Sequence, residues 1–222
     1  KKVVYTSYIG AYPANEIFVE PSEFDPGKEP PPMDMFPGWA KRMGEMQILA
    51  YKKQYGMTNM AIVRPCNVYG PWDNFDPENA MVIPSLIHRA TSGERPLKVW
   101  GDGSPIRDFI HTNDVAEGMI KIIEKGYNKP VNLGSGDGVT IKQIAQTIAE
   151  CMPDKCEIIW DTSKPSGDKK RIMNTERAKS LGINPIISLK EGIKSTIEWY
   201  NQNGNNTKDR YNAFTDKLYK KN

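Results

Sequence analysis

Residues 64–86, RPCNVYGPWDNFDPENAMVIPSL, constrain the fold more than any other stretch of the chain. The uncharged run that begins at residue 60 predicts a parallel strand buried on both faces. This strand leads into a polar loop whose glycine and prolines favour turns, and then into a predicted helix at residues 80–90. Ligands of open α/β sheets bind beyond the carboxyl ends of the strands, so we expect a ligand site in this loop. A structured loop without a ligand is the alternative.

The other hydrophobic patterns predict that strands and helices alternate along the chain. Further strands are expected at residues 1–7, 97–100, 130–133 and 158–160, and further helices at residues 39–55, 113–125, 141–148, 175–181 and 189–202. Proline-rich residues 13–38 predict a mobile loop, and polar residues 203–222 predict a tail. The predicted fold class is α/β. Residues 1–96 form the C-terminal part of a doubly wound, Rossmann-like parallel sheet, and residues 97–202 form a smaller α/β substrate-binding lobe that interleaves with it.

Charge and cysteine usage exclude several classes of function. The formal net charge of +3 is too small to indicate a nucleic-acid partner. No apolar run approaches the roughly 20 residues that span a bilayer, so no membrane partner is expected. The three cysteines have no C-x-x-C spacing, which predicts reduced thiols in a cytoplasmic protein without a zinc site or a disulfide.

Four motifs resemble the nucleotide-sugar branch of the extended short-chain dehydrogenase/reductases. They are N-x-Y-G-P-x-D-N-F-x-P…V-I-P at residues 67–84, WGDGSPIRDFIHTND at residues 100–114, NLGSGDGVT at residues 132–140, and the stretch at residues 160–200. Within that branch they are most similar to those of the GDP-L-fucose synthases. The resemblance implies an NAD- or NADP-dependent epimerase, dehydratase or reductase that acts on a nucleoside-diphosphate sugar. It also implies a homodimer in which the predicted helix at residues 39–55, with Met43 and Met46, packs against its symmetry mate.

One family element is not found in the sequence. In this fold a glycine-rich turn after the first strand binds the pyrophosphate of the dinucleotide. The nearest imitation is GSGDG at residues 134–138, whose third glycine falls one residue early, and we interpret it as a tight turn with Thr140 as a helix cap. The resemblance therefore leads us to expect that the chain is a fragment without the N-terminal dinucleotide-binding segment.

This sequence departs from the family pattern mainly at the positions whose side chains transfer protons. Lys41 matches the lysine of the family's Y-x-x-x-K pattern, but Pro37 stands at the tyrosine. Tyr8 stands at the position of the family's serine. Gly10 and Met81 stand where the fucose synthases have a cysteine and a histidine as acid and base.

Three residues are the catalytic candidates that remain, namely Lys41, Tyr8 and Ser7. A tyrosine can move the proton that accompanies a hydride when a nearby ammonium favours its phenolate form. One hypothesis is that the Tyr8 ring enters the space vacated at Pro37 and brings its phenol toward Lys41. The alternative is that Tyr8 only fills volume.

The binding residues follow from the resemblance as well. It implies cofactor contacts from Lys41, Pro65, Asn67 and Val68. It implies substrate contacts from Asn67, Val82, Arg89, Trp100, Arg107, Lys164 and Arg171, with Lys170 beside them. Arginine forks suit phosphate oxygens, and we expect Arg89, Arg107 and Trp100 to line one hollow. Solvated surface charge is the alternative for each of these cations.

Two further interpretations concern the histidines. Asp108, His111 and Asp114 could bind a metal, but we favour hydrogen bonds to local backbone groups and predict no metal site. His88 is interpreted as a helix-face residue and not as a general base.

Two other functions stay open. A catalytically inactive nucleotide-sugar-binding or interaction protein is the main alternative, because the family's proton-transfer groups are replaced. An amino-acid dehydrogenase of the same superfamily is the weaker one, because V-I-P-x-L and WGDGSPIRDFIH match the sugar-nucleotide enzymes.

Overall fold

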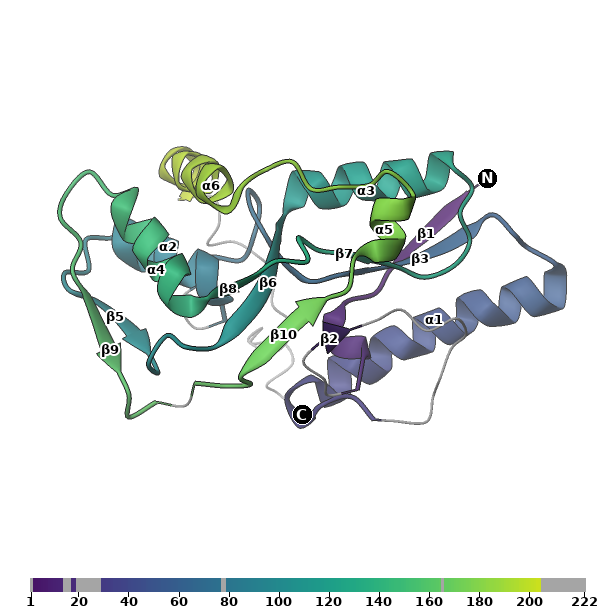
Figure 1. Cartoon of the computed structure of the whole chain (residues 1–222), viewed down its shortest axis with the longest axis horizontal. Helices are drawn as coiled ribbons and strands as arrows, with labels where there is room; N and C mark the ends of the chain where they lie inside the picture. The colour runs from purple at the N-terminus through teal and green to yellow at the C-terminus, as the bar shows by residue number, and fades with distance from the viewer. Residues whose placement is uncertain (1, 14–16, 19–28, 77–78, 165, 205–222) are drawn as a thin grey trace, which may run out of the picture.

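The chain folds around two parallel sheets that meet end to end (Figure 1). A computed structural model describes residues 2–13, 17–18, 29–76, 79–164 and 166–204. The first sheet has the order β1 (Val3–Thr6), β3 (Met60–Pro65), β7 (Val131–Leu133). Helix α1 (Met35–Tyr55) covers one face of it and α3 (Thr112–Glu124) the other. All six residues of β3 are buried, as expected for a strand covered on both faces.

The second sheet continues from the carboxyl ends of the first. Its parallel strands have the order β2 (Ile17–Phe18), β10 (Lys170–Met173), β6 (Ile106–His111), β4 (Asn67–Tyr69). The short strand β8 (Gly138–Thr140) pairs antiparallel with β6. Strand β3 ends at Pro65 and β4 begins at Asn67, so the chain passes from one sheet to the other through Cys66 alone.

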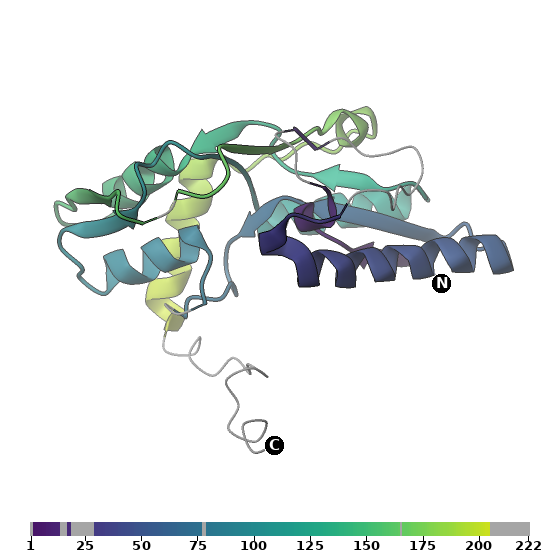
Figure 2. The same cartoon turned by 90° about the horizontal axis from the view of Figure 1, so that it is seen from below.

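A smaller lobe packs beside the second sheet (Figure 2). Helices α2 (Val82–Thr91), α4 (Ile141–Glu150) and α6 (Leu189–Asn203) share one core with the parallel ribbon of β5 (Leu97–Trp100) and β9 (Ile158–Asp161). Ile87, Leu97, Ile144 and Ile193 are fully buried in that core. Helix α5 (Glu176–Ser180) and the 3-10 turns η1 (Ile9–Ala11) and η2 (Pro32–Asp34) complete the described elements.

The predicted α/β class with parallel strands is confirmed, and the boundaries need corrections. The helix expected from residue 39 begins at Met35, because a proline is tolerated in the first turn of a helix. Within the predicted loop at residues 13–38, residues 17–18 pair with β10 as β2; residues 14–16 and 19–28 lie outside the described residues. Strands β4, β6, β8 and β10 were not predicted. The predicted tail lies outside the described residues from residue 205 onward.

Two smaller predictions also have an outcome. Thr140 caps α4, and its hydroxyl forms a capping box with Gln143, as the turn interpretation of residues 134–138 requires. Among the described residues no helix is both long and apolar enough to cross a bilayer. The division of the chain at residue 96 stays a prediction.

Candidate functional site

The candidate site lies where the carboxyl ends of the first sheet meet strands β6 and β10 of the second sheet. Helix α1 runs along the first sheet and brings Lys41 to the end of β1, where its ammonium donates to the Thr6 carbonyl at 2.9 Å. We call this part, with Lys41, Ser7 and Tyr8, the lysine end. It lies at the carboxyl end of a parallel strand, where ligands of this architecture bind.

A buried ion pair fixes α1 at the lysine end. Glu45 is one turn beyond Lys41, and its carboxylate accepts two hydrogen bonds from Arg64 on β3, at 2.8 and 2.5 Å. Burial disfavours the charge of Arg64, but the bonds to Glu45 outweigh it and raise the pKa of Arg64. The Arg64 guanidinium also lies 4.7 Å from the centre of the Tyr12 ring. This pair sets the position of the helix face that carries Lys41.

Ser7 and Tyr8 follow the end of β1. The Ser7 hydroxyl is buried and has no hydrogen-bond partner, although its amide donates to the Val63 carbonyl at 2.8 Å. The Tyr8 hydroxyl donates to Asp34 at 3.1 Å, and its ring lies over Gly10, where any side chain would overlap it. Burial first, and then the Asp34 carboxylate, raise the pKa of Tyr8 and keep the phenol neutral.

The hypothesis that Tyr8 fills the space at Pro37 is therefore corrected. The ring occupies the room left by the missing side chain at Gly10, and the hydroxyl has Asp34 as its partner. Pro37 is exposed in the first turn of α1. At neutral pH this phenol keeps its proton, and because its pKa is raised it is a weaker acid than a free tyrosine, so its surroundings oppose the phenolate form.

The residues predicted to contact the cofactor are close together along the chain. Pro65 ends β3 in a buried position, and Val68 is partly exposed on β4. The Asn67 side-chain amide donates to the Asp108 carbonyl at 2.7 Å, which ties β4 to β6. The Lys41 ammonium has further hydrogens beyond the one on Thr6. The assignment of Lys41, Pro65, Asn67 and Val68 to the cofactor stays a prediction, and the Asn67 side-chain amide already has a partner within the sheet.

Two arginines lie side by side at the start of the second sheet. Arg107 on β6 and Arg171 on β10 are register partners. Arg107 donates to the Asp168 carbonyl at 2.7 Å, and Arg171 forms an ion pair with Asp34 at 2.8 Å. Burial, and then the charge of Arg171, lower the pKa of Arg107. Two adjacent, partly desolvated guanidiniums favour an anion with more than one charge.

Trp100 is connected to this pair through Ser166, which lies against Gly101, and Gly167, which lies against Arg107. The Lys164 ammonium lies 5.6 Å from the centre of the Trp100 ring, and Trp100 is 61% exposed. We call Trp100, Arg107, Lys164 and Arg171 the arginine end.

Arg89 is held at the connection from α2 to β5. Its guanidinium pairs with Glu94 at 2.5 Å and donates to the Lys98 carbonyl on β5. Val82, another predicted contact, is the first residue of α2 and partly buried. The hollow expected between Arg89, Arg107 and Trp100 stays a prediction.

The polar residues of β6 and the following helix serve the backbone. The buried Asp108 carboxylate accepts hydrogen bonds from the amides of Ser135, Gly136 and Met173 at 2.9 to 3.2 Å, and burial raises its pKa. His111 caps α3, and Asp114 accepts the amides of residues 186 and 187 at 3.1 Å. His88, on the helix face as predicted, is bonded to the Tyr200 hydroxyl at 2.6 Å. The interpretation of Asp108, His111 and Asp114 as partners of backbone groups is confirmed.

A comparison with known protein families decides the relationship of this chain. Residues 1–134 match the NAD dependent epimerase/dehydratase family. The chain belongs to this family.

Several individual proteins are similar to this chain in sequence or in fold. GDP-L-fucose synthase 1 of Arabidopsis thaliana is 36% identical over 169 residues, which cover 74% of this chain and 52% of that protein. The UDP-glucose 4-epimerase of Thermotoga maritima, solved with UDP-glucose, is 31% identical and has a TM-score of 0.73 over 91% of this chain and 64% of its own. The fold of a GDP-L-fucose synthetase from Naegleria fowleri bound to NADP matches with a TM-score of 0.79 at 23% identity, over 92% of this chain and 67% of that chain.

The chain spans about half the length of the curated relatives it matches, since it covers 51% and 52% of three plant proteins. The match to the family covers more than half of this chain.

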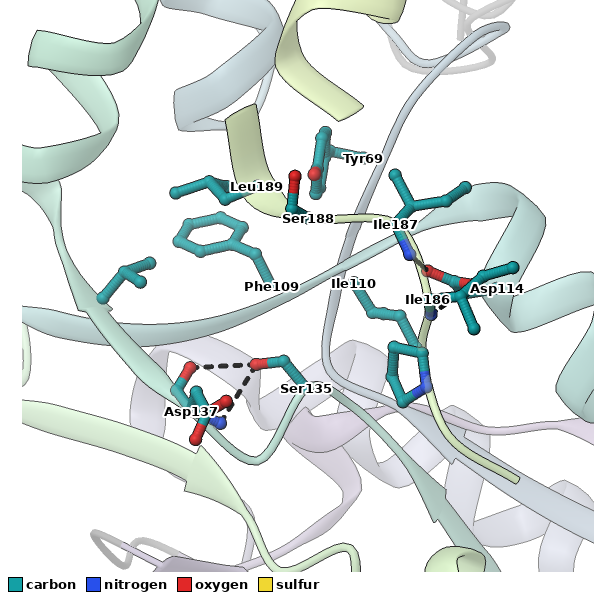
Figure 3. Close-up of a pocket in the computed structure, with 12 residues that line it drawn as sticks. Tyr69, Phe109, Ile110, Asp114, Ser135, Asp137, Ile186, Ile187, Ser188 and Leu189 are labelled. Atoms are coloured by element: carbon teal, nitrogen blue, oxygen red, sulfur yellow. Dashed lines mark hydrogen bonds between the residues drawn. The ribbon is translucent and has the colours of Figure 1, made fainter. Parts of the chain in front are cut away.

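A cavity of about 380 Å³ opens between β6 and the segment that precedes α6 (Figure 3). It is bounded by Tyr69, Phe109, the turn at residues 135–137 and the segment at residues 185–189. Of the residues that line it, Asp114 accepts the amide of Ile186, and the amide and hydroxyl of Ser135 donate to the Asp108 carboxylate. None of the residues predicted to bind cofactor or substrate lines this cavity.

Two acidic residues of the site were missed in the sequence. Asp34 connects Tyr8 with Arg171, and Asp168 accepts a bond from Arg107 through its carbonyl. Asp34 stands in a proline-rich stretch without periodicity, and β10, which brings Arg171 to it, was not predicted. No local signal in the sequence marks either residue.

Proposed function

We propose that this chain is the nucleotide-sugar-binding part of an NAD- or NADP-dependent epimerase, dehydratase or reductase of the GDP-L-fucose synthase type. Its substrate is a nucleoside-diphosphate sugar. The observation that carries the proposal is the pairing of Arg107 and Arg171 in register on β6 and β10. Membership of the family supplies the reaction class.

The arginine end binds the two ends of the diphosphate group in this proposal. Arg107 and Arg171 provide planar donor forks, and Lys164 adds a third cation next to Trp100. The indole of Trp100 offers an apolar face to the base or to a sugar ring. The sugar then extends toward the lysine end, where the family's chemistry takes place.

The lysine end positions the reacting sugar carbon and its hydroxyl. A nicotinamide cofactor supplies or accepts the hydride when bound, and Lys41, Pro65, Asn67 and Val68 are the residues that we assign to it. Lys41 holds its ammonium at the end of β1, and the buried Ser7 hydroxyl is an available donor to a sugar oxygen. Because Pro37 has no side-chain proton, we assign proton donation to the phenol of Tyr8.

The test is a calorimetric titration of the protein with a GDP-linked and a UDP-linked hexose, with and without NADPH. We expect saturable binding that Arg107→Ala weakens by about tenfold or more, because one charge-assisted fork is lost. The matched control is Lys125→Ala, which removes a positive charge at the end of α3, remote from the site. Equal losses in both variants would contradict the assignment of the arginine end.

The second candidate function is a nucleotide-sugar-binding protein without catalysis. It is favoured by one specific observation, the bond of Tyr8 to Asp34 beside a proline at the family's tyrosine. Hydride exchange between nicotinamide and the bound sugar separates the two functions. Binding without any exchange supports the non-catalytic reading.

We also propose a homodimer formed through α1. The solvent side of this helix carries Phe36, Met43 and Met46, and Phe36 is 87% exposed. Burying such a face against a second copy removes apolar area from water. Light scattering should give twice the chain mass, and Met43→Lys should shift it to the monomer. A cytoplasmic location is proposed from the free thiols of Cys66, Cys151 and Cys156.

A further inference from the structure

Asp34 touches both ends of the candidate site. One carboxylate oxygen accepts the Tyr8 hydroxyl at 3.1 Å, and the other accepts Arg171 at 2.8 Å. The ion pair is largely shielded, with side-chain exposures of 10% for Arg171 and 16% for Asp34. Arg171 also packs against the Phe18 ring, 5.6 Å from its centre. Asp34 is thus the residue that holds Arg171 on the side facing η2.

Arg171 is held differently from its neighbour Arg107. Arg107 bonds to the carbonyls of Ile106 and Asp168, which carry no net charge. Arg171 has a carboxylate at 2.8 Å and a second one, from Asp168, at 3.8 Å. The Asp168 carboxylate also acts on Arg107 through its charge, but Arg107 forms no ion pair that an anion must break, whereas an anion must compete with Asp34 for Arg171.

We propose that Asp34 is a specificity-determining residue that competes with the ligand for Arg171 and so lowers the affinity for a diphosphate that bridges both arginines, while the affinity for a single phosphate at Arg107 is unaffected. A diphosphate that bridges both arginines takes Arg171 over from Asp34. A single phosphate binds at Arg107 and leaves the ion pair in place. This inference rests on the proposed function of the arginine end and adds to it a residue that the family pattern does not mark.

The exchange has a consequence at the lysine end. Once Arg171 turns to the diphosphate, the Asp34 carboxylate keeps the Tyr8 hydroxyl as its partner. The contact between η2 and β10 is replaced by one that runs through the ligand. Occupation of the arginine end is thereby transmitted to the residue that we assign to proton donation.

The test uses inorganic pyrophosphate and orthophosphate as probes of the whole protein, by calorimetry at constant ionic strength. In Asp34→Asn we expect pyrophosphate to bind about tenfold more tightly, because its competitor has lost its charge. Orthophosphate affinity should change by less than about threefold, since Arg107 is unaffected. Asp154→Asn, an exposed aspartate in the turn after α4, is the matched control for net charge and should change neither.

A double variant assigns the gain to Arg171. In Asp34→Asn with Arg171→Gln the gain for pyrophosphate should vanish. If Asp34→Asn is poorly folded by circular dichroism, Asp34→Ser provides the same removal of charge with a smaller group. Unchanged or weaker pyrophosphate binding in a folded Asp34 variant overturns the inference, as does an equal gain for both anions.

The outcome separates this inference from the proposed function. Binding of nucleotide sugar together with an unresponsive Asp34 variant refutes the role of Asp34 and leaves the function in place. A selective gain for pyrophosphate in a protein that binds no nucleotide sugar supports the role of Asp34 and refutes the function. If neither the unmodified protein nor the Asp34→Asn variant binds pyrophosphate, the inference is overturned.

Discussion

The lysine end and the arginine end differ in how their functional groups are used by the protein itself. At the arginine end, Arg107 and Arg171 lie in register on adjacent strands, and Trp100 is exposed. At the lysine end, the ammonium is bonded to a carbonyl, the phenol of Tyr8 to Asp34, and Pro37 has no side-chain proton to give. The arginines that we propose for nucleotide-sugar binding are therefore kept side by side, whereas the family's proton-transfer groups are replaced or bonded within the protein. In this proposal, binding and proton transfer are separable properties.

The largest effect is expected from removing the buried acid that holds α1. Glu45→Ala leaves the Arg64 guanidinium buried without its carboxylate and should lower the free energy of unfolding by about 3–5 kcal/mol. Urea denaturation followed by circular dichroism measures it. The double variant Glu45→Ala with Arg64→Leu should recover most of the loss. A loss below about 1 kcal/mol would show that the lysine end is not held by this pair.

Restoring a tyrosine sharpens the comparison next. Pro37 lies one helical turn before Lys41, and Pro37→Tyr should raise hydride transfer from NADPH by about 10–100-fold by supplying a proton donor. Nucleotide-sugar affinity should stay within about twofold, because the arginine end is untouched. Pro37→Phe is the matched control without the hydroxyl. An equal gain in hydride transfer in Pro37→Phe would assign the effect to the packing of α1 and not to the hydroxyl.

The contact between Tyr8 and Gly10 predicts a smaller, strongly coupled effect. Gly10→Cys should cost about 1–3 kcal/mol of stability, since its side chain overlaps the Tyr8 ring. In a Tyr8→Ser background the same substitution should be nearly neutral. Thermal denaturation of the four proteins gives the coupling energy. Additive effects would mean that the ring moves aside without cost.

The smallest effect concerns pH and the amino cap of α3. Burial, partly offset by Asp114, lowers the pKa of His111. The folded protein then binds fewer protons than the unfolded chain, so stability falls as pH drops below the unfolded pKa of about 6.5. His111→Asn retains an acceptor for the Asn113 amide and should flatten the melting temperature between pH 7 and pH 5.5. An unaltered slope would assign the acid sensitivity to other groups.

The sequence was sufficient for elements with a clear period and insufficient for those without one. Helix α4 with its Thr140 cap and the buried strand β3 follow from local patterns. Strand β6 does not, because the charged Asp108 lies fully buried within it and hides the apolar alternation.

The binding residues were within reach of sequence motifs, but their arrangement was not. The pairing of Arg107 with Arg171 depends on the register of β6 and β10, two strands far apart in sequence. The role of Asp34 depends on the same long-range pairing, since it reaches Arg171 only in the folded chain. The ion pair of Arg89 with Glu94 is likewise seen only in the folded chain. Such contacts are decided by tertiary packing and leave no periodic trace.

The single residue between β3 and β4 sets the distance between the two ends of the site. Cys66 is buried, and its amide is bonded to the Leu133 carbonyl at 2.8 Å, so the connection between the two sheets is short and held in place. A rigid joint fixes the separation between the end of β1 and the start of β6. A ligand that reaches from the arginines to the ammonium must therefore have the right length, and chain length becomes a criterion of selection beside charge and shape.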